Sequence, residues 1–293
     1  MRSEQEMFDL IVRFAKKDKR IRAVYMNGSR TNPNVPSDVF QDYDIVYVVT
    51  ETSTFIKDEK WINRFGDLLM VQEPDKLDQG IGLSVNFERT YAYLMLFTDG
   101  NRIDLRLLTK EAMLDEYEKD KLTVPLLDKD NILPSIPPPT DIDYHVKKLT
   151  EEQFISYTNN FWWCLQNVAK GIWRDELPYA KQMFESTTRE SLDQMVSCWI
   201  GIKYDFTIST GKLGKYFKKY LPEPYWTMYK ETYSNSNYED MWHSILVTCD
   251  LFRIVSQDVA KQLNFTYPID SDTNMTNYLK HVKELPANAT RIY

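Results

Sequence analysis

Two aspartates, Asp42 and Asp44, are separated by one residue and lie just before a run of five apolar residues, 45–49. Side chains two residues apart in an extended chain point to the same side, so the pair predicts two carboxylates at the start of a buried strand. Like charges this close repel each other, and a divalent cation that prefers oxygen ligands would offset the repulsion. The pair therefore indicates a site for Mg²⁺, which often binds one or two carboxylates together with substrate phosphates.

A third carboxylate, Asp104, lies in a segment where it alternates with apolar residues, as do Arg102 and Arg106. This alternation predicts a strand with its polar side chains on one face. If that strand is a neighbour of the strand that begins near Asp44, the three carboxylates converge. Such a set could bind two metal ions that clamp the attacking and leaving oxygens of a phosphoryl transfer. On the pattern alone, a hairpin loop with solvated carboxylates is the alternative.

Gly28, Ser29 and Arg30 come just after a strand-like run, 21–26. Glycine allows the backbone to approach a phosphate closely. The Ser29 hydroxyl and the neighbouring backbone N–H groups can donate hydrogen bonds to a phosphate oxygen, and Arg30 adds positive charge. We therefore predict that these three residues bind the phosphates of a nucleotide.

Lys212 and Lys215 lie in a second segment with basic residues and glycines, 211–215, which precedes a short basic helix. The segment lacks the glycine spacing and the Ser or Thr of a P-loop. Two interpretations are open. In the first, both lysines contact a triphosphate, and in the second they form the solvated start of a helix.

Trp173, Asp175 and Glu176 form an aromatic and acidic group near the end of a predicted helix. Carboxylates can bind a guanidinium group through two hydrogen bonds, and indole rings attract cations, so the group could bind a cationic substrate. The alternative is a core tryptophan followed by acids that cap the next helix, and this second interpretation is favoured because large aromatic residues are mostly buried.

Short runs rich in Val, Ile, Leu and Tyr dominate the first part of the chain and predict strands. They occupy residues 21–26, 44–50, 68–72, 91–97 and 102–108, and an amphipathic helix is predicted over residues 3–18. An Asp-Gly pair within residues 98–101 is a hairpin signal. The last two strands should therefore be antiparallel neighbours.

The second part of the chain shows helical spacing of apolar and aromatic residues, which predicts a helical bundle. The predicted helices cover residues 150–172, 182–209, 222–233 and 238–263. Four prolines within residues 133–140 predict a stiff linker. We therefore expect an α+β chain with two domains, residues 1–136 and residues 137–293.

The charge balance limits the partners, because 36 Lys and Arg stand against 43 Asp and Glu, for a net charge of −7. Proteins that bind nucleic acid normally carry a basic domain, so nucleic acid is not expected and a cationic partner is favoured. No run of about 18 apolar residues predicts a membrane span, and the first residues lack the apolar block of a signal peptide. Three cysteines without metal-site spacing fit a reducing cytoplasm.

Gly28-Ser29, Asp42-Tyr43-Asp44 and Asp104 resemble the signature of the nucleotidyltransferase superfamily that includes DNA polymerase beta. Longer stretches resemble the aminoglycoside 6-adenylyltransferases, which inactivate streptomycin, and the likeness runs nearly from end to end. These stretches are MNGSRTNPNVPSDVFQDYDIVYVV, FTDGNRIDLRL, FWWCLQNVAKGIWRDELPYAK and TGKLGKYFKKYL.

The resemblance implies an N-terminal polymerase-beta-like mixed sheet with flanking helices, a C-terminal helical bundle, and an active site in the cleft between them. It implies Mg²⁺-dependent transfer of AMP from ATP to the 6-hydroxyl of streptomycin, with release of pyrophosphate and resistance to the antibiotic. Carried over by position, Asp42 and Asp44 would hold Mg²⁺, and Gly28 and Ser29 would bind the β- and γ-phosphates. Asp104 would act as general base, as metal ligand, or as both.

Two alternatives stay open at this point. The same fold could adenylylate another acceptor, such as a different antibiotic or a protein hydroxyl. The chain could instead be a nucleotide-binding module without catalytic activity, although three intact carboxylates argue against that. A monomer is favoured over an oligomer.

Overall fold

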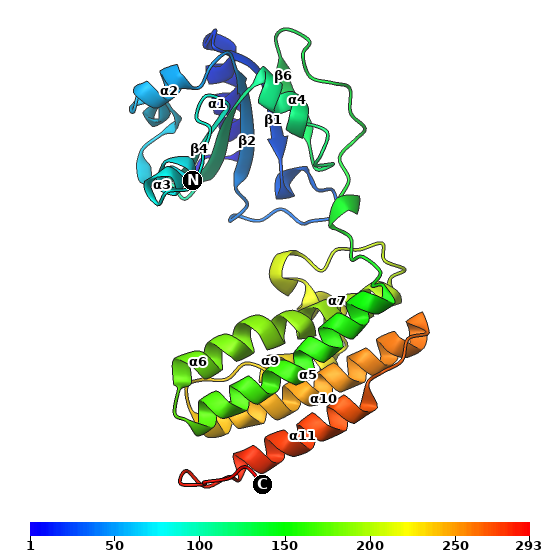
Figure 1. Ribbon diagram of the computed structural model, residues 1–293. Coiled ribbons are helices and arrows are strands. Elements are labelled where there is room, and N and C mark those ends of the chain that lie inside the picture. Colours follow the sequence, from blue (N-terminus) through cyan, green and yellow to red (C-terminus); the bar gives the residue numbers. More distant parts are fainter. The chain divides into compact units, whose positions relative to one another are not determined.

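In the computed structural model, which describes residues 1–293, the chain separates into two units, Met1–Asp143 and Tyr144–Tyr293 (Figure 1). The first unit is built around a sheet and the second is helical, as the sequence predicts. None of the helices is both long enough and apolar enough to span a membrane.

One six-stranded mixed sheet forms the centre of the first unit, in the order β3-β4-β5-β2-β1-β6. Its strands are β1 (Ile21–Asn27), β2 (Tyr43–Val49), β3 (Leu68–Gln72), β4 (Thr90–Phe97), β5 (Arg102–Thr109) and β6 (Val124–Asp128). The helices of this unit are α1 (Glu4–Lys17), α2 (Ser53–Lys57), α3 (Pro74–Gly80) and α4 (Lys110–Glu116), with short 3₁₀ turns at Ser29–Thr31, Trp61–Phe65 and Ile142–Tyr144.

Helix α1 covers one face of the sheet. A capping box starts it, in which the Ser3 hydroxyl accepts from the Glu6 N–H and the Glu6 carboxylate accepts from the Ser3 N–H, so two free backbone donors at the helix start are satisfied. Met7, Ile11 and Ala15 then recur at helical spacing and are fully buried. They pack in one core with the odd-numbered residues of β2 and β5.

Helix α4 covers the other face of the sheet. It packs in a second core with Val46, Val48 and Leu108, which alternate along β2 and β5 with the residues that face α1. Farther along the same face, toward the start of both strands, lie Asp44 and Asp104. The seven-residue helix α4 is too short to cover the whole face.

The parallel pairing of β2 with β5 is the central feature of the sheet, because it joins strands that are distant in sequence. Its register places Asp44 opposite Asp104. Strands β4 and β5 are antiparallel neighbours, as the Asp-Gly pair predicts.

The proline-rich stretch differs from the prediction of a linker. Ile132, Leu133 and Ile136 pack against the core beneath α4, and the Asp128 carboxylate accepts hydrogen bonds from the N–H groups of Ile132 and Leu133 at 3.1 and 2.9 Å. The apolar residues between the prolines therefore attach this stretch to the first unit. The division between the units falls after Asp143, later than the boundary at residue 136 expected from the prolines alone.

The second unit is helical throughout. Its helices are α5 (Glu151–Trp173), α6 (Leu177–Gln182), α7 (Arg189–Lys203), α8 (Phe217–Tyr220), α9 (Glu223–Glu231), α10 (Tyr238–Leu263) and α11 (Ile269–Lys283), with a π-helical turn at Met183–Thr188 and a 3₁₀ turn at Lys212–Gly214. Helices α5, α7, α10 and α11 lie side by side (Figure 1) and share one core. Phe161 of α5 stacks on Phe252 of α10 within it, with ring centroids 3.6 Å apart.

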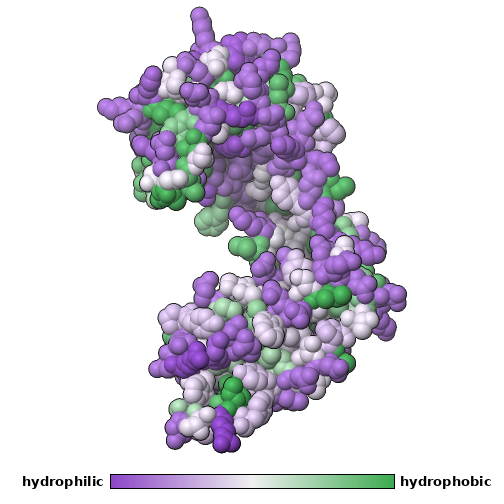
Figure 2. Space-filling model, viewed as in Figure 1, coloured by the Kyte–Doolittle hydropathy of each residue, from purple (hydrophilic) through white to green (hydrophobic).

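The surface of the first unit exposes apolar side chains at the β3 edge of the sheet and just after α3. Leu69, Met70 and Ile81 are 65%, 66% and 77% exposed. Figure 2 shows apolar residues gathered over this part of the first unit, on a visible face that is otherwise largely hydrophilic.

Candidate active site

Three carboxylates converge at one end of the sheet. Asp44 and Asp104 lie opposite each other near the start of β2 and β5, and Asp42 comes directly before β2. One oxygen of each carboxylate lies within 4.8 Å of an oxygen of the other two. The set offers only oxygen donors, which Mg²⁺ prefers, so these residues could hold the ion predicted from the sequence.

Asp44 is the most deeply placed of the three carboxylates. Burial, together with the negative charges of Asp42 and Asp104, raises its pKa to about 7. The side chains of Asp42 and Asp104 are 29% and 17% exposed. A divalent cation would relieve both the repulsion and the cost of burying the Asp44 charge, so the electrostatics of the site are suited to a metal ion.

Gly28 lies against the innermost carboxylate. Its backbone has φ +78° and ψ −159°, a conformation that is essentially restricted to glycine. A Cβ atom at this position would lie 1.9 Å from the Asp44 Oδ2. Gly28 is therefore required by both the backbone conformation and the close approach of Asp44.

Ser29 and Arg30 differ in what they can offer a phosphate. The Ser29 hydroxyl makes no hydrogen bond within the protein, so it is available to a ligand. The Arg30 side chain is only 8% exposed, and its guanidinium donates to the carbonyls of Gln41 and Asp42 at 2.8 and 2.9 Å and lies over the Tyr43 ring. The sequence predicts that Arg30 contacts a phosphate. This geometry instead favours a structural role, in which Arg30 holds the backbone of Gln41 and Asp42 in place.

Arg102 is a residue of the site that the sequence analysis did not single out as functional. Its guanidinium donates to both oxygens of Asp104 at 2.7 and 2.5 Å, and its Nε lies 3.8 Å from the Asp42 Oδ2. The signal that could have found it is its alternation with Asp104 along β5. Arg102 brings one fixed positive charge to the three carboxylates.

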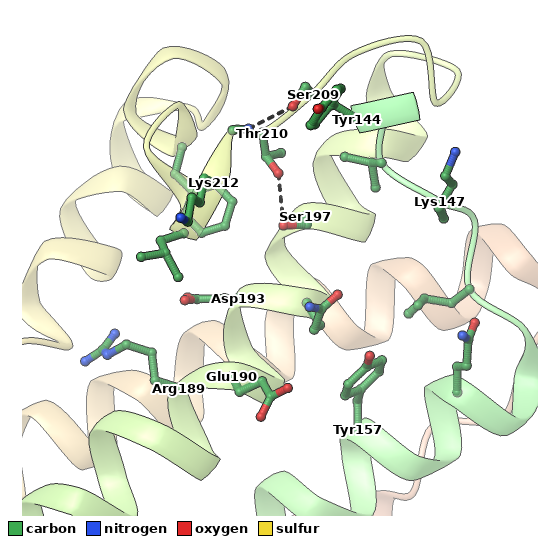
Figure 3. Close-up of a pocket in the computed structure, with 18 of the residues that line it drawn as sticks. Tyr144, Lys147, Tyr157, Arg189, Glu190, Asp193, Ser197, Ser209, Thr210 and Lys212 are labelled. Carbon is green, nitrogen blue, oxygen red and sulfur yellow. Dashed lines mark hydrogen bonds between the residues drawn. The ribbon is translucent and has the colours of Figure 1, made fainter. Parts of the chain in front are cut away.

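Lys212 and Lys215 belong to the second unit and differ in their surroundings. Lys212 lines a cavity of about 950 Å³ in the helical unit (Figure 3). The Lys215 ammonium lies 5.1 Å from the centroid of the Tyr216 ring, and Lys215 does not line that cavity. Both lysines are exposed, and Lys212 is the better placed to meet a ligand.

Trp173, Asp175 and Glu176 make their contacts within the helical unit, and the Glu176 side chain, at the N-cap position of α6, makes no capping hydrogen bond. The Trp173 indole donates to the Pro286 carbonyl at 3.2 Å, and Asp175 accepts from the Tyr238 hydroxyl at 2.8 Å. The Glu176 N–H donates to the Gly171 carbonyl at the end of α5. None of the three residues lines the 950 Å³ cavity.

The smaller cavity that Trp173 does line is poorly suited to a cation. It measures about 360 Å³, and its charged side chains are Lys170, Arg174 and Arg291. Three positive charges without a carboxylate would repel a guanidinium or ammonium group.

Comparison with known proteins gives one family over almost the whole chain. The family model described as streptomycin adenylyltransferase matches residues 1–282. An aminoglycoside 6-adenylyltransferase of Campylobacter jejuni is 43% identical over 284 residues, which cover 97% of each chain. One of Bacillus subtilis (strain 168) is 36% identical, over 96% of this chain and 98% of the relative.

A solved structure is also similar, that of an aminoglycoside 6-adenyltransferase from Bacillus subtilis. It is 31% identical, with coverage of 97% of this chain and all of the other and a TM-score of 0.48.

The family model and the curated relatives, together with the mixed sheet, the glycine turn and the three converging carboxylates, define the protein as a nucleotidyltransferase. The chain belongs to the streptomycin adenylyltransferase family.

Proposed function

We propose that this enzyme transfers AMP from ATP to a hydroxyl of an aminoglycoside and releases pyrophosphate, which inactivates the antibiotic. The acceptor we propose is streptomycin, at its 6-hydroxyl, in the cytoplasm. The convergence of Asp42, Asp44 and Asp104 within 4.8 Å carries the proposal, because phosphoryl transfer depends on positioning and on neutralising the charge at the attacking and leaving oxygens. The names of the relatives supply the acceptor class.

Asp42, Asp44 and Asp104 are the residues that would hold Mg²⁺, since all three present oxygen ligands at one point. When bound there, Mg²⁺ would neutralise the triphosphate and lower the pKa of the acceptor hydroxyl. Asp104 is also the carboxylate that we propose as the proton acceptor. Arg102 holds it through two hydrogen bonds, which fixes the orientation of its oxygens.

Gly28 and Ser29 are the proposed phosphate-binding residues of the sheet unit. The turn that begins at Gly28 places Ser29 directly after β1, and the free Ser29 hydroxyl can donate to a phosphate oxygen. We propose that Lys212 of the helical unit adds a positive charge for the triphosphate, with Lys215 in a weaker role. The sheet unit would then carry the phosphate chemistry, and the helical unit would bind the acceptor and part of the nucleotide.

The test is pyrophosphate release by the purified protein with ATP, Mg²⁺ and streptomycin, with mass spectrometry of the drug. Parallel reactions contain spectinomycin, kanamycin or a lincosamide, and Asp42→Asn serves as the inactive control. We expect release with streptomycin, an adduct heavier by one AMP, and neither in the control. Turnover with another drug instead would overturn the acceptor, and full turnover by Asp42→Asn would overturn the metal site.

A further inference from the structure

The large cavity of the helical unit has the size of a small-molecule site. It measures about 950 Å³, near the upper end of the range for such pockets. Its walls come from the start of α5, the start of α7 and the loop that carries Ser209 to Lys212 (Figure 3). All of them belong to the second unit.

One ion pair in the cavity wall is fully satisfied within the protein. The Arg189 guanidinium donates to Glu185 at 2.5 Å, and to the hydroxyl and carbonyl of Thr232 at 2.9 and 3.1 Å. It also lies over the Tyr233 ring, and its side chain is only 9% exposed. Arg189 is therefore part of the wall, and its charge and that of Glu185 offset each other.

Two other carboxylates line the cavity and form no ion pair within the protein. Glu190 and Asp193 both line the cavity from α7, and Figure 3 shows Glu190 pointing toward Tyr157 and Asp193 pointing away from it. Asp193 accepts a hydrogen bond from the Tyr229 hydroxyl at 2.8 Å, but neither carboxylate forms an ion pair. Asp193 is half-buried, which makes an unpaired negative charge costly there.

The backbone around the cavity is unusual at two separate places. The turn at Met183–Thr188, which leads into α7 and carries Glu185 and Ser186 onto the wall, is π-helical. Such turns are rare in proteins, and many of those that occur lie at functional sites. On the opposite loop, Leu213 lines the cavity with φ +56° while 90% exposed. Residues with strained backbone conformations cluster at active sites and ligand clamps.

We propose that this cavity binds the cationic part of the acceptor, with Glu190 and Asp193 pairing with a guanidinium or ammonium group. A guanidinium can donate two parallel hydrogen bonds to one carboxylate, and streptomycin carries two guanidinium groups. The ring of Tyr157, which reaches the cavity from α5 on the side toward which Glu190 points, supplies an aromatic face for a cation at Glu190. Lys147 and Lys212 also line the cavity, so a phosphate group would lie at Lys212 and the cation at the carboxylates of α7. The inference rests on the proposed function for its choice of ligand.

The experiment measures streptomycin binding by titration calorimetry without ATP, and separately the KM for streptomycin and for ATP. The variants are Glu190→Gln and Asp193→Asn, which keep side-chain size and remove the charge. The matched control is Asp270→Asn, an exposed acid at the start of α11 outside the cavity. Thermal unfolding checks each variant, and because Glu190 is exposed, Glu190→Gln should keep the native fold.

We expect each cavity variant to weaken streptomycin binding and raise its KM by about tenfold to a hundredfold, the effect of losing one charge-assisted contact, with the KM for ATP unchanged within about twofold. The Asp270→Asn control should match the wild type. Asp42→Asn should bind streptomycin normally although inactive, which separates binding from turnover.

The outcomes distinguish the two proposals. Turnover of streptomycin with an unchanged KM in both cavity variants would overturn the inference and leave the proposed function standing. Streptomycin binding that is lost in the variants, without turnover in the wild type, would support the inference and overturn the proposed function. A wild-type protein that neither binds nor modifies streptomycin would overturn both.

Discussion

Gly28 and Asp44 constrain each other through a single contact. The register of β1 on β2 pairs Asn27 with Asp44, so the chain turns at Gly28 directly beside that carboxylate. The space that a side chain would need is already filled by the Asp44 Oδ2. The glycine of the Gly-Ser motif is therefore needed for a steric reason, the close approach of Asp44, in addition to the phosphate contact predicted for the motif.

Replacing Gly28 by Ala should damage activity more than stability. The new Cβ would force Asp44 to move by about 1 Å, and a misplacement of that size can cost about a hundredfold in turnover. The cost in unfolding free energy should be about 1–3 kcal/mol, from the glycine-only backbone conformation. Pyrophosphate release and chemical denaturation of the same preparation measure the two effects.

Gly100→Ala is the matched control for this prediction. Gly100 also has a positive φ, +85°, but a Cβ there would meet nothing within 4 Å. The control should lose stability through the backbone alone and keep its turnover. Equal activities of the two variants would show that the contact with Asp44 does not matter.

At the scale of elements, the site depends on which strands are neighbours. The hairpin of β4 and β5 could be predicted, because residues 98–101 carry a local turn signal. The parallel neighbour of β2 could not, since β5 lies more than 50 residues away in the chain and period-2 alternation does not specify a partner. The sequence therefore predicted the carboxylate cluster only on the condition that β2 and β5 are neighbours, and the structure shows that they are.

Elements with weak local signals were missed. Strand β6 contains Pro125, which disfavours a strand but is tolerated here because β6 is at the edge of the sheet. Helix α11 is rich in Asn, Asp and Thr, which are poor helix formers, and it forms because Leu279 and Val282 are buried in the helical core. The cavity carboxylates on α7 gave no signal, since periodicity does not show that a helix face opens onto a cavity.

Asp193 links helices α7 and α9 through Tyr229, and its charge state should control part of the stability of the helical unit. Burial raises the pKa of Asp193 to about 6, although the Tyr229 hydrogen bond and the charge of Arg189 oppose the rise. Between pH 4 and 6 the folded state therefore binds more protons than the unfolded state. The free energy of unfolding falls as the pH rises through this window, by up to about 3 kcal/mol.

Asp193→Asn should remove this pH dependence and stabilise the metal-free protein at pH 7, because Asn can still accept the Tyr229 hydrogen bond. Denaturation midpoints of wild type and variant at pH 4 and pH 7 measure the difference. Glu185→Gln gives the contrast. It should destabilise the protein, since it leaves the Arg189 charge buried without its partner. A loss of stability between pH 4 and pH 7 that is as large in Asp193→Asn as in the wild type would contradict the prediction.

At the scale of the whole molecule, each unit has a hydrophobic core of its own. The first unit packs two cores, one on each face of its sheet, and the second has one core that joins α5, α7, α10 and α11. The units contain 143 and 150 residues, sizes at which a chain can bury enough apolar surface to fold alone. The carboxylate cluster belongs to the first unit and the proposed acceptor cavity to the second.

Residues 1–143 and 144–293, produced as separate chains, should therefore each fold with one cooperative thermal transition. Neither should release pyrophosphate from ATP and streptomycin alone, because the first lacks the cavity carboxylates and Lys212 and the second lacks the carboxylate cluster. Circular dichroism and the pyrophosphate assay are the measurements, with the intact chain as positive control.

Streptomycin binding by the two fragments is a separate test. Binding that residues 144–293 retain, and that Asp193→Asn reduces within that fragment, would assign acceptor recognition to the helical unit. Binding retained only by residues 1–143 would place the acceptor on the sheet and rule that assignment out.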